Sequence, residues 1–116
     1  MNPVAEGAHW PLTITQGATF DAFFEYKDQD GVPISLVGYT AKGQVRKKED
    51  ETSDLYATFT IVVDGAAGTL SVSLTPTQTQ AIPKTGYYDI FLLSGSARYL
   101  FLQGPAILDP RVTDLS

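Results

Sequence analysis

The sequence contains no cysteine, and only one histidine, one tryptophan and one methionine. Without cysteine the chain has neither a disulfide framework nor a thiolate metal site. The sequence has no Gly-x-Ser-x-Gly motif, so the single histidine, His9, has no serine nucleophile of that kind to activate as a general base. It stands beside Trp10, and we interpret it as a packing or capping residue. We therefore expect no catalytic residues, no metal and no cofactor.

Charged residues and long apolar runs are also scarce. Charged residues make up 18% of the chain, and the net charge is −5. The one basic run, residues 46–48, is followed at once by the acidic residues 49–51, so we expect no nucleic-acid binding. No apolar run approaches the ~20 residues of a membrane span. Residues 1–8 lack the charged flank and apolar core of a signal peptide. We expect a soluble protein that binds no membrane.

What the sequence does contain is apolar residues that recur with a period of two, which is typical of strands with one buried face. Strands are predicted over residues 19–27, 39–47, 55–63, 69–75, 87–93 and 98–103. Leu55 begins the inward set of the third of these strands. The residues expected to form the core are Phe20, Phe24, Tyr26, Val45, Phe59, Ile61, Leu70, Val72, Leu74, Ile90 and Leu92.

The segments between the strands carry turn residues. Residues 28–31, 64–68 and 94–96 each combine glycine with aspartate or serine, which predicts turns. Thr75 is a suitable N-cap and Pro76 a suitable first helical residue, so one short helical turn is predicted near 76–82. About seven short strands with frequent turns predict an all-β fold, a single antiparallel β-sandwich.

The two ends of the chain lack this pattern. Residues 1–8 are interpreted as an extended N-terminal arm, residues 9–109 as the sandwich domain and residues 110–116 as a C-terminal tail. Pro105 and Pro110 predict that the segment from 104 onward is an edge strand followed by a tail, rather than a central strand. We expect both ends to reach onto neighbouring subunits.

Two acidic segments could hold a cation. Asp28, Asp30 and Gly31 resemble part of a calcium loop. Val37 stands where the bidentate glutamate would be needed, so a turn is the better interpretation. Residues 49–54 are acidic and are interpreted as a solvated loop, with a cation site or a dock for a basic partner as the alternative.

Aromatic residues offer the candidate interaction site. If Tyr88 points inward, Tyr87 and Phe91 point outward, and Tyr99 and Phe101 would join them from the neighbouring strand. Such a patch favours a protein interface, with sugar stacking as the alternative. The interface candidates are Tyr87, Phe91, Tyr99, Phe101, His9 and Trp10.

The order of several short motifs resembles a known family. Residues 13–20 (TITQGATF) open the pattern, followed by 36–41 (LVGYTA), 68–70 (GTL), 83–89 (PKTGYYD) and a closing 110–113 (PRVT). This order is similar to small all-β virion proteins of tailed bacteriophages, which occupy baseplates, tail-fibre attachment sites or head–tail appendages.

The resemblance implies an immunoglobulin-like sandwich and a non-enzymatic structural role in the virion, most of all as a tail, baseplate or fibre-attachment adaptor. A carbohydrate- or receptor-binding module is the alternative. The implied partners are other virion proteins in a symmetric multi-copy assembly, formed in the host cytoplasm. Because the chain stops at Ser116, we expect a stand-alone adaptor rather than the first domain of a longer fibre.

Overall fold

The computed structural model describes residues 8–28, 30–48 and 52–110, which form nine strands and one short helix. The predicted arm and tail lie mostly outside this part. The elements are β1 (Ala8–His9), β2 (Leu12–Thr15), β3 (Phe20–Glu25), β4 (Thr40–Arg46), β5 (Leu55–Thr58), β6 (Thr60–Asp64), β7 (Thr69–Leu74), α1 (Pro76–Ala81), β8 (Gly86–Ser94) and β9 (Ala97–Asp109).

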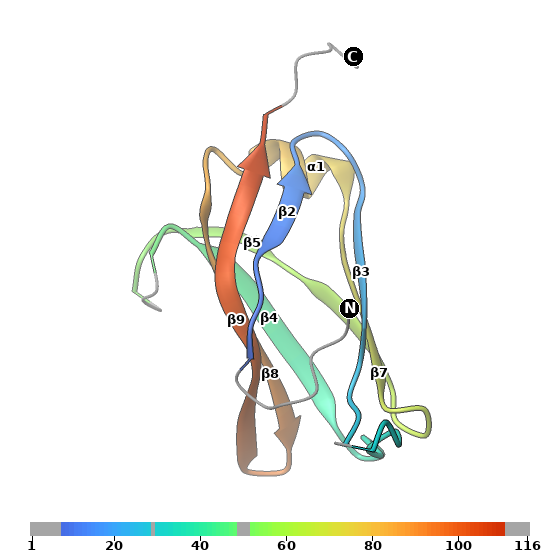
Figure 1. Ribbon diagram of the computed structural model, residues 1–116. Helices are drawn as coiled ribbons and strands as arrows, with labels where there is room; N and C mark the ends of the chain where they lie inside the picture. Colours follow the sequence, from blue (N-terminus) through green and yellow to red (C-terminus); the bar gives the residue numbers. More distant parts are fainter. Residues whose placement is uncertain (1–7, 29, 49–51, 111–116) are drawn as a thin grey trace.

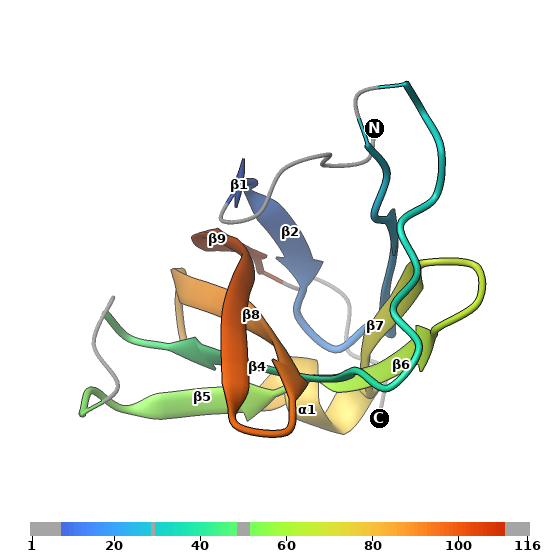
Figure 2. The same cartoon turned by 90° about the horizontal axis from the view of Figure 1, so that it is seen from below.

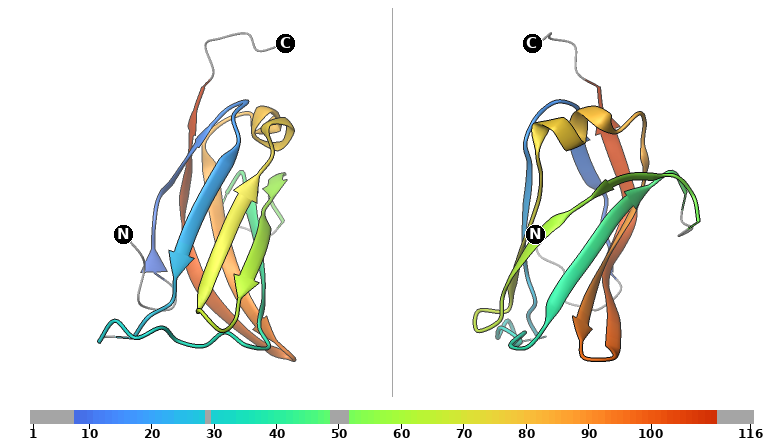
Figure 3. Two further views of the ribbon diagram at one scale, coloured as in Figure 1. Left: turned by 90° about the vertical axis from the view of Figure 1, so that its right-hand side faces the viewer. Right: turned by 180° about the vertical axis from the view of Figure 1, so that it is seen from behind.

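The strands form two sheets that pack face to face, so the predicted β-sandwich is confirmed (Figure 1). The larger sheet has the order β1-β9-β8-β4-β5, and β2 also pairs with β9. The smaller sheet has the order β3-β7-β6, and Figure 3 shows it as a separate layer in front of β8 and β9. Among the described residues, the predicted turns at 64–68 and 94–96 join β6 to β7 and β8 to β9.

Residues 55–63, predicted as one strand, are two strands in different sheets. β5 pairs with β4 in the larger sheet, whereas β6 pairs with β7 in the smaller one. The change occurs at Phe59, whose backbone N–H donates to the carbonyl oxygen of Gly43 at 2.9 Å. A bulge between Val45 and Arg46 places Leu55 opposite Arg46 on the outer face, where Leu55 is 49% exposed. The prediction that Leu55 faces the core is therefore wrong.

β9 is a central strand, which corrects the expectation of an edge strand from residue 104 onward. It pairs antiparallel with β8 on one side and parallel with β1 and β2 on the other. Pro105 is tolerated because β1 stops pairing at Gln103 and β2 starts only at Ala106. The missing N–H of Pro105 therefore falls in the gap between two paired segments.

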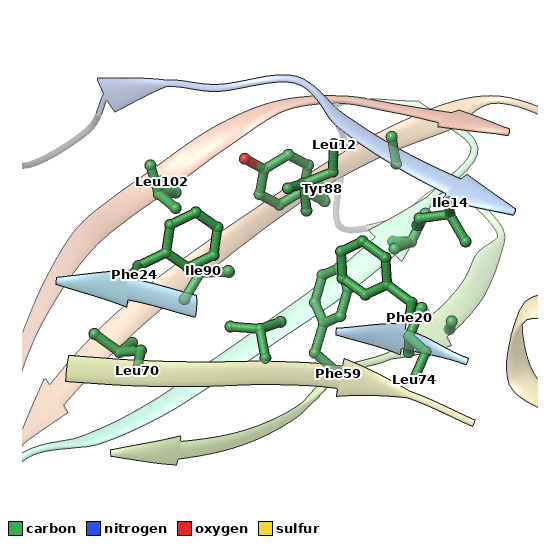
Figure 4. Close-up of a cluster of buried hydrophobic side chains, with 14 of the residues drawn as sticks. Leu12, Ile14, Phe20, Phe24, Phe59, Leu70, Leu74, Tyr88, Ile90 and Leu102 are labelled. Carbon is green, nitrogen blue, oxygen red and sulfur yellow. The ribbon is translucent and has the colours of Figure 1, made fainter. Parts of the chain in front are cut away.

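The core lies between the two sheets and is mostly the predicted one (Figure 4). Nine of the eleven predicted core residues are buried, and Tyr26 and Ile61 are partly buried at its margin. Phe59 links the sheets by ring contacts with Phe20 and with Tyr88, at centroid distances of 6.1 Å in both cases. Among the other buried residues, Ala57 and Tyr88 were predicted to face inward and Phe101 outward. No facing was predicted for the remaining ones, which are Leu12, Ile14, Leu36, Ile82, Leu102 and Ala106.

The predicted helical turn is present as α1. Thr75 caps it: the Thr75 hydroxyl accepts from the N–H of Gln78 at 3.2 Å, and the Gln78 side chain accepts from the N–H of Thr75 at 2.8 Å. Pro76 occupies the start of the helix. Thr79 is fully buried and joins α1 to the β2–β3 turn, because its hydroxyl donates to the carbonyl oxygen of Ala18 at 2.8 Å. The described residues include no helix with the length and apolarity of a membrane crossing.

Candidate interaction surface

The outer face of the six-stranded sheet carries aromatic, amide and charged side chains in register. Residues paired directly across neighbouring strands point to the same side of a sheet. Tyr87 is 39% exposed and Phe91 partly buried, while Tyr88 between them is in the core, so the predicted alternation of β8 is confirmed. Three rows cross β4, β8 and β9 on this face, namely Lys42, Phe91 and Leu100; Gln44, Asp89 and Gln103; and Arg46, Tyr87 and Pro105.

Tyr99 and Phe101 are not part of this face, contrary to the prediction. The pairing of β8 with β9 shifts by one residue after Ile90, because Ile90 pairs with Leu102 and Phe91 pairs with Leu100. Phe101 is the extra residue of this bulge, and it is fully buried against Tyr26 at a centroid distance of 5.5 Å. A one-residue insertion reverses which side chains face outward.

The same bulge places Tyr99 on the inner side of β9, opposite the buried Leu92. Tyr99 remains 40% exposed and lies 6.4 Å from the ring of Tyr39. Leu100 faces outward beside Phe91 instead. Leu100 was not among the interface candidates predicted from the sequence. The sequence does not determine the facing of this segment, because residues 99–102 (YLFL) are an unbroken run of four apolar residues rather than an alternation.

A polar row runs across four strands of this face. His9 on β1 pairs with Gln103, and their Nε2 atoms are 3.3 Å apart. Gln103 pairs with Asp89, which pairs in turn with Gln44. His9 is exposed, which fits an outer-face position rather than the packing role predicted for it. Amide and carboxylate groups therefore lie between the two aromatic positions, Tyr87 and Phe91.

Asp89 stands at the centre of this row. Burial by its neighbours raises the pKa of the Asp89 carboxyl, and the positive charge of Arg46 lowers it in part. The Arg46 guanidinium is held in place by Gln44, whose Oε1 accepts from Nη2 at 2.8 Å, and by the carbonyl oxygen of Ser53, which accepts from Nη1 at 2.8 Å. The arrangement keeps a fixed cation beside an aspartate and next to Tyr87.

Trp10 is partly buried and acts through its backbone. In the parallel pairing, the Trp10 N–H donates to the carbonyl oxygen of Gln103 at 2.9 Å. In a regular parallel ladder the Trp10 carbonyl oxygen would accept from the N–H of residue 105. Residue 105 is proline, which has no N–H, so this backbone hydrogen bond cannot form. The hydroxyl of Tyr88 donates to that oxygen instead. Gly104 makes room, since a Cβ there would lie 2.8 Å from the same oxygen.

The two acidic segments differ in what the structure describes. The Asp28 carboxylate accepts from the N–H of Asp30 at 2.9 Å and of Val32 at 3.0 Å, which supports the turn interpretation. Residues 49–51 of the acidic loop lie outside the described residues. Within the part of the chain that is described, no three His, Asp or Glu side chains are grouped as metal ligands would be.

The outer face of the three-stranded sheet carries a second apolar surface. Phe23 is 57% exposed and Val62 is 63% exposed, and both lie in one row with Ser71 between them. The small serine leaves a shallow hollow of about 260 Å³ between the two apolar side chains, bordered also by Asp21 and Ser73. Figure 2 shows the two sheets from below, with this face and the β8–β9 face on different sides of the molecule.

Comparison with known proteins adds the family. Residues 6–107 match the family described as LtfC-like, beta-sandwich domain. The chain belongs to this family. The family is associated with phage tail fibres, so the match indicates a β-sandwich phage protein, as the motif order also indicated. No curated protein matches the chain.

Proposed function

We propose that this LtfC-like domain is a non-enzymatic structural component of the phage virion, a tail, baseplate or fibre-attachment adaptor that acts through protein–protein contacts. The observation that carries the proposal is the outer face of the six-stranded sheet. Tyr87 lies there beside Arg46 in one row, and Phe91 and Leu100 lie beside Lys42 in another, with the polar row of Asp89 between them. Aromatic residues and arginine are enriched at protein interfaces, and they supply much of the binding energy.

The family supports the same location. A phage tail-fibre family is consistent with a place in the particle, in contact with other virion proteins as part of a symmetric multi-copy assembly.

We also infer that the sandwich is immunoglobulin-like. The order β3-β7-β6 packed on β9-β8-β4-β5 parallels the B-E-D and G-F-C-C′ strands of variable-type domains.

The experiment is to complement a phage that lacks this gene with variants and to measure their incorporation into particles. Tyr87→Asp replaces an exposed aromatic side chain of this face with a charge and is expected to reduce incorporation at least tenfold while the isolated protein stays folded. Tyr99→Asp is the matched control, since Tyr99 is equally exposed but lies on the inner side of β9. Equal incorporation of the wild type and Tyr87→Asp contradicts the proposal.

One observation favours the alternative of carbohydrate or receptor binding. The polar row of Gln44, Asp89 and Gln103 lies between Tyr87 and Phe91 on one flat face, and amides, carboxylates and aromatic rings together suit a sugar. Titration of the isolated protein with host-surface glycans distinguishes the two functions. Saturable binding that Asp89→Ala abolishes, together with normal particle incorporation of that variant, supports the alternative and contradicts the adaptor.

A further inference from the structure

The face of the six-stranded sheet described above carries exposed positive charge, and we call it the basic face. Lys42 lies in the row of Phe91, and Arg98 lies one row further toward the β8–β9 turn, opposite Leu93. Both are exposed, and neither has an ion-pair partner among the described residues. Arg46 adds a third positive charge, which Asp89 offsets in part. Phe91 and Leu100 therefore have exposed cations beside them, while the carboxylates of this face, Asp89 and Asp109, lie one row or more away toward its other end.

The outer face of the three-stranded sheet has the opposite sign, and we call it the acidic face. Asp21 on β3 and Asp64 on β6 lie in the two rows on either side of the row that holds Phe23 and Val62. Both aspartates are exposed, and neither forms an ion pair within the described part of the chain. Glu25, also on β3, lies 3.1 Å from Lys27. This face thus pairs an apolar centre with an acidic margin.

The hollow of the acidic face also offers a place for an aromatic side chain of the basic face. The acidic face is hollowed between Phe23 and Val62, and serines form the floor. The basic face presents Tyr87, whose ring is 39% exposed. A tyrosine suits such a hollow, because its ring contacts the apolar walls while its hydroxyl reaches Asp21 or the serines. Arg46, in the row of Tyr87, and Lys42, two rows away, would then be the cations nearest to the aspartates at the margin.

From this match we propose that the basic face of one copy of the chain binds the acidic face of a second copy, with Tyr87 entering the hollow. The inference deepens the proposed function, on which it rests, by naming a second copy as one of the virion partners. The two surfaces belong to different sheets, so each copy keeps one of them free after pairing (Figure 2). Such a head-to-tail contact builds a ring or a filament instead of a two-fold dimer.

The test measures self-association of the full chain by analytical ultracentrifugation, from micromolar to millimolar protein. We expect species larger than a dimer at low ionic strength, and weaker association near 1 M salt, where the Debye length falls to about 3 Å. A chain that stays monomeric at low ionic strength over the whole range overturns the proposal.

Charge reversal identifies the faces. Lys42→Glu and Asp21→Lys each replace an attraction across the contact with a repulsion, and each is expected to weaken self-association about tenfold or more. An equimolar mixture of the two variants restores opposite charges at every contact and should associate like the wild type. Lys84→Glu makes the same change as Lys42→Glu in the α1–β8 connection, away from both faces, and should leave association unchanged. Failure of the mixture to associate, or an equal loss with Lys84→Glu, contradicts the proposal.

Two further results separate this inference from the proposed function. Tyr87→Ala should weaken self-association, whereas Tyr99→Ala, with similar exposure on the inner side, should not. If the isolated chain stays monomeric and yet enters particles in a Tyr87-dependent manner, the copy-to-copy contact is wrong and the adaptor function stands. If the chain self-associates but does not enter particles, the adaptor function is wrong and the contact stands.

Discussion

Replacing Tyr88 with phenylalanine removes one oxygen atom from a position where the fold offers no substitute. The Tyr88 hydroxyl donates to the carbonyl oxygen of Trp10. The backbone donor that parallel pairing would otherwise supply is missing, because residue 105 is proline. The Tyr88 ring is 4% exposed and stays packed against Phe59 in either variant. The substitution therefore tests the hydrogen bond between the N-terminal segment and β8 with little change in packing.

The magnitude follows from leaving a partly buried acceptor without its donor. Leaving a buried carbonyl oxygen without a hydrogen-bond donor lowers the free energy of unfolding by about 1–3 kcal/mol. Trp10 is only partly buried, so water can reach this segment, and the lower half of that range is expected. We therefore expect Tyr88→Phe to lower the free energy of unfolding by about 1–2 kcal/mol. For a domain of this size such a loss lowers the melting temperature by roughly 5–10 °C.

The assay is urea unfolding followed by circular dichroism, with the midpoint and the slope fitted separately. Tyr87→Phe is the control, since it removes the same hydroxyl from the adjacent, exposed residue and should change stability by less than about 0.5 kcal/mol. Hydrogen exchange at the Trp10 amide should rise more than exchange in β7 for Tyr88→Phe. Equal stability of Tyr88→Phe and Tyr87→Phe would show that the hydroxyl does not hold the N-terminal segment.

Three further outcomes are expected. Phe24→Ala should cost about 3–5 kcal/mol in urea unfolding, whereas Phe23→Ala, its exposed neighbour, should cost less than about 1 kcal/mol; similar losses would contradict the assigned facing of β3. Gly86→Ala should cost about 2 kcal/mol or more, because its Cβ would lie 2.3 Å from the Arg46 carbonyl oxygen; a wild-type midpoint would refute this. Burial raises the pKa of Tyr88, so the stability it contributes should be complete below about pH 10, the unfolded value, and fall as the pH rises further. The Tyr88→Phe variant should lose less stability over the same alkaline range. If the free energy of unfolding falls equally with pH in the wild type and in Tyr88→Phe, ionisation of Tyr88 is not the cause of the loss.

The sequence was sufficient for features that depend on neighbouring residues. The alternation in β3 and β7 identified Phe24, Leu70 and Val72 as core residues, because a strand with one buried face repeats every two residues. The N-cap at Thr75 was predictable for a similar reason, since a capping side chain bonds within its own first turn. In each case the determining interaction lies within a few residues of the pattern that signals it.

Features that depend on pairing between distant strands could not be predicted in this way. The bulge at Phe101 belongs to the pairing of β9 with β8, in which Ile90 lies opposite Leu102 and Phe91 opposite Leu100. One extra residue there buries Phe101 and brings Leu100 to the outer face. The apolar run of residues 99–102 does not decide which side chains face outward, and the prediction that Tyr99 and Phe101 do so misplaced two of the six interface candidates.

The assignment of strands to sheets has the largest consequence for function. Asp21 and Lys42 lie on consecutive strands of the chain, β3 and β4, and local pattern treats both simply as outward polar residues. Because the connection between β3 and β4 crosses from the smaller sheet to the larger one, the two charges come to lie on opposite outer faces. A hairpin between the same strands would have placed them side by side, where they could neutralise each other. The separation of charge that makes one face complementary to the other is thus a property of the topology, and charge reversal at these two positions tests it directly.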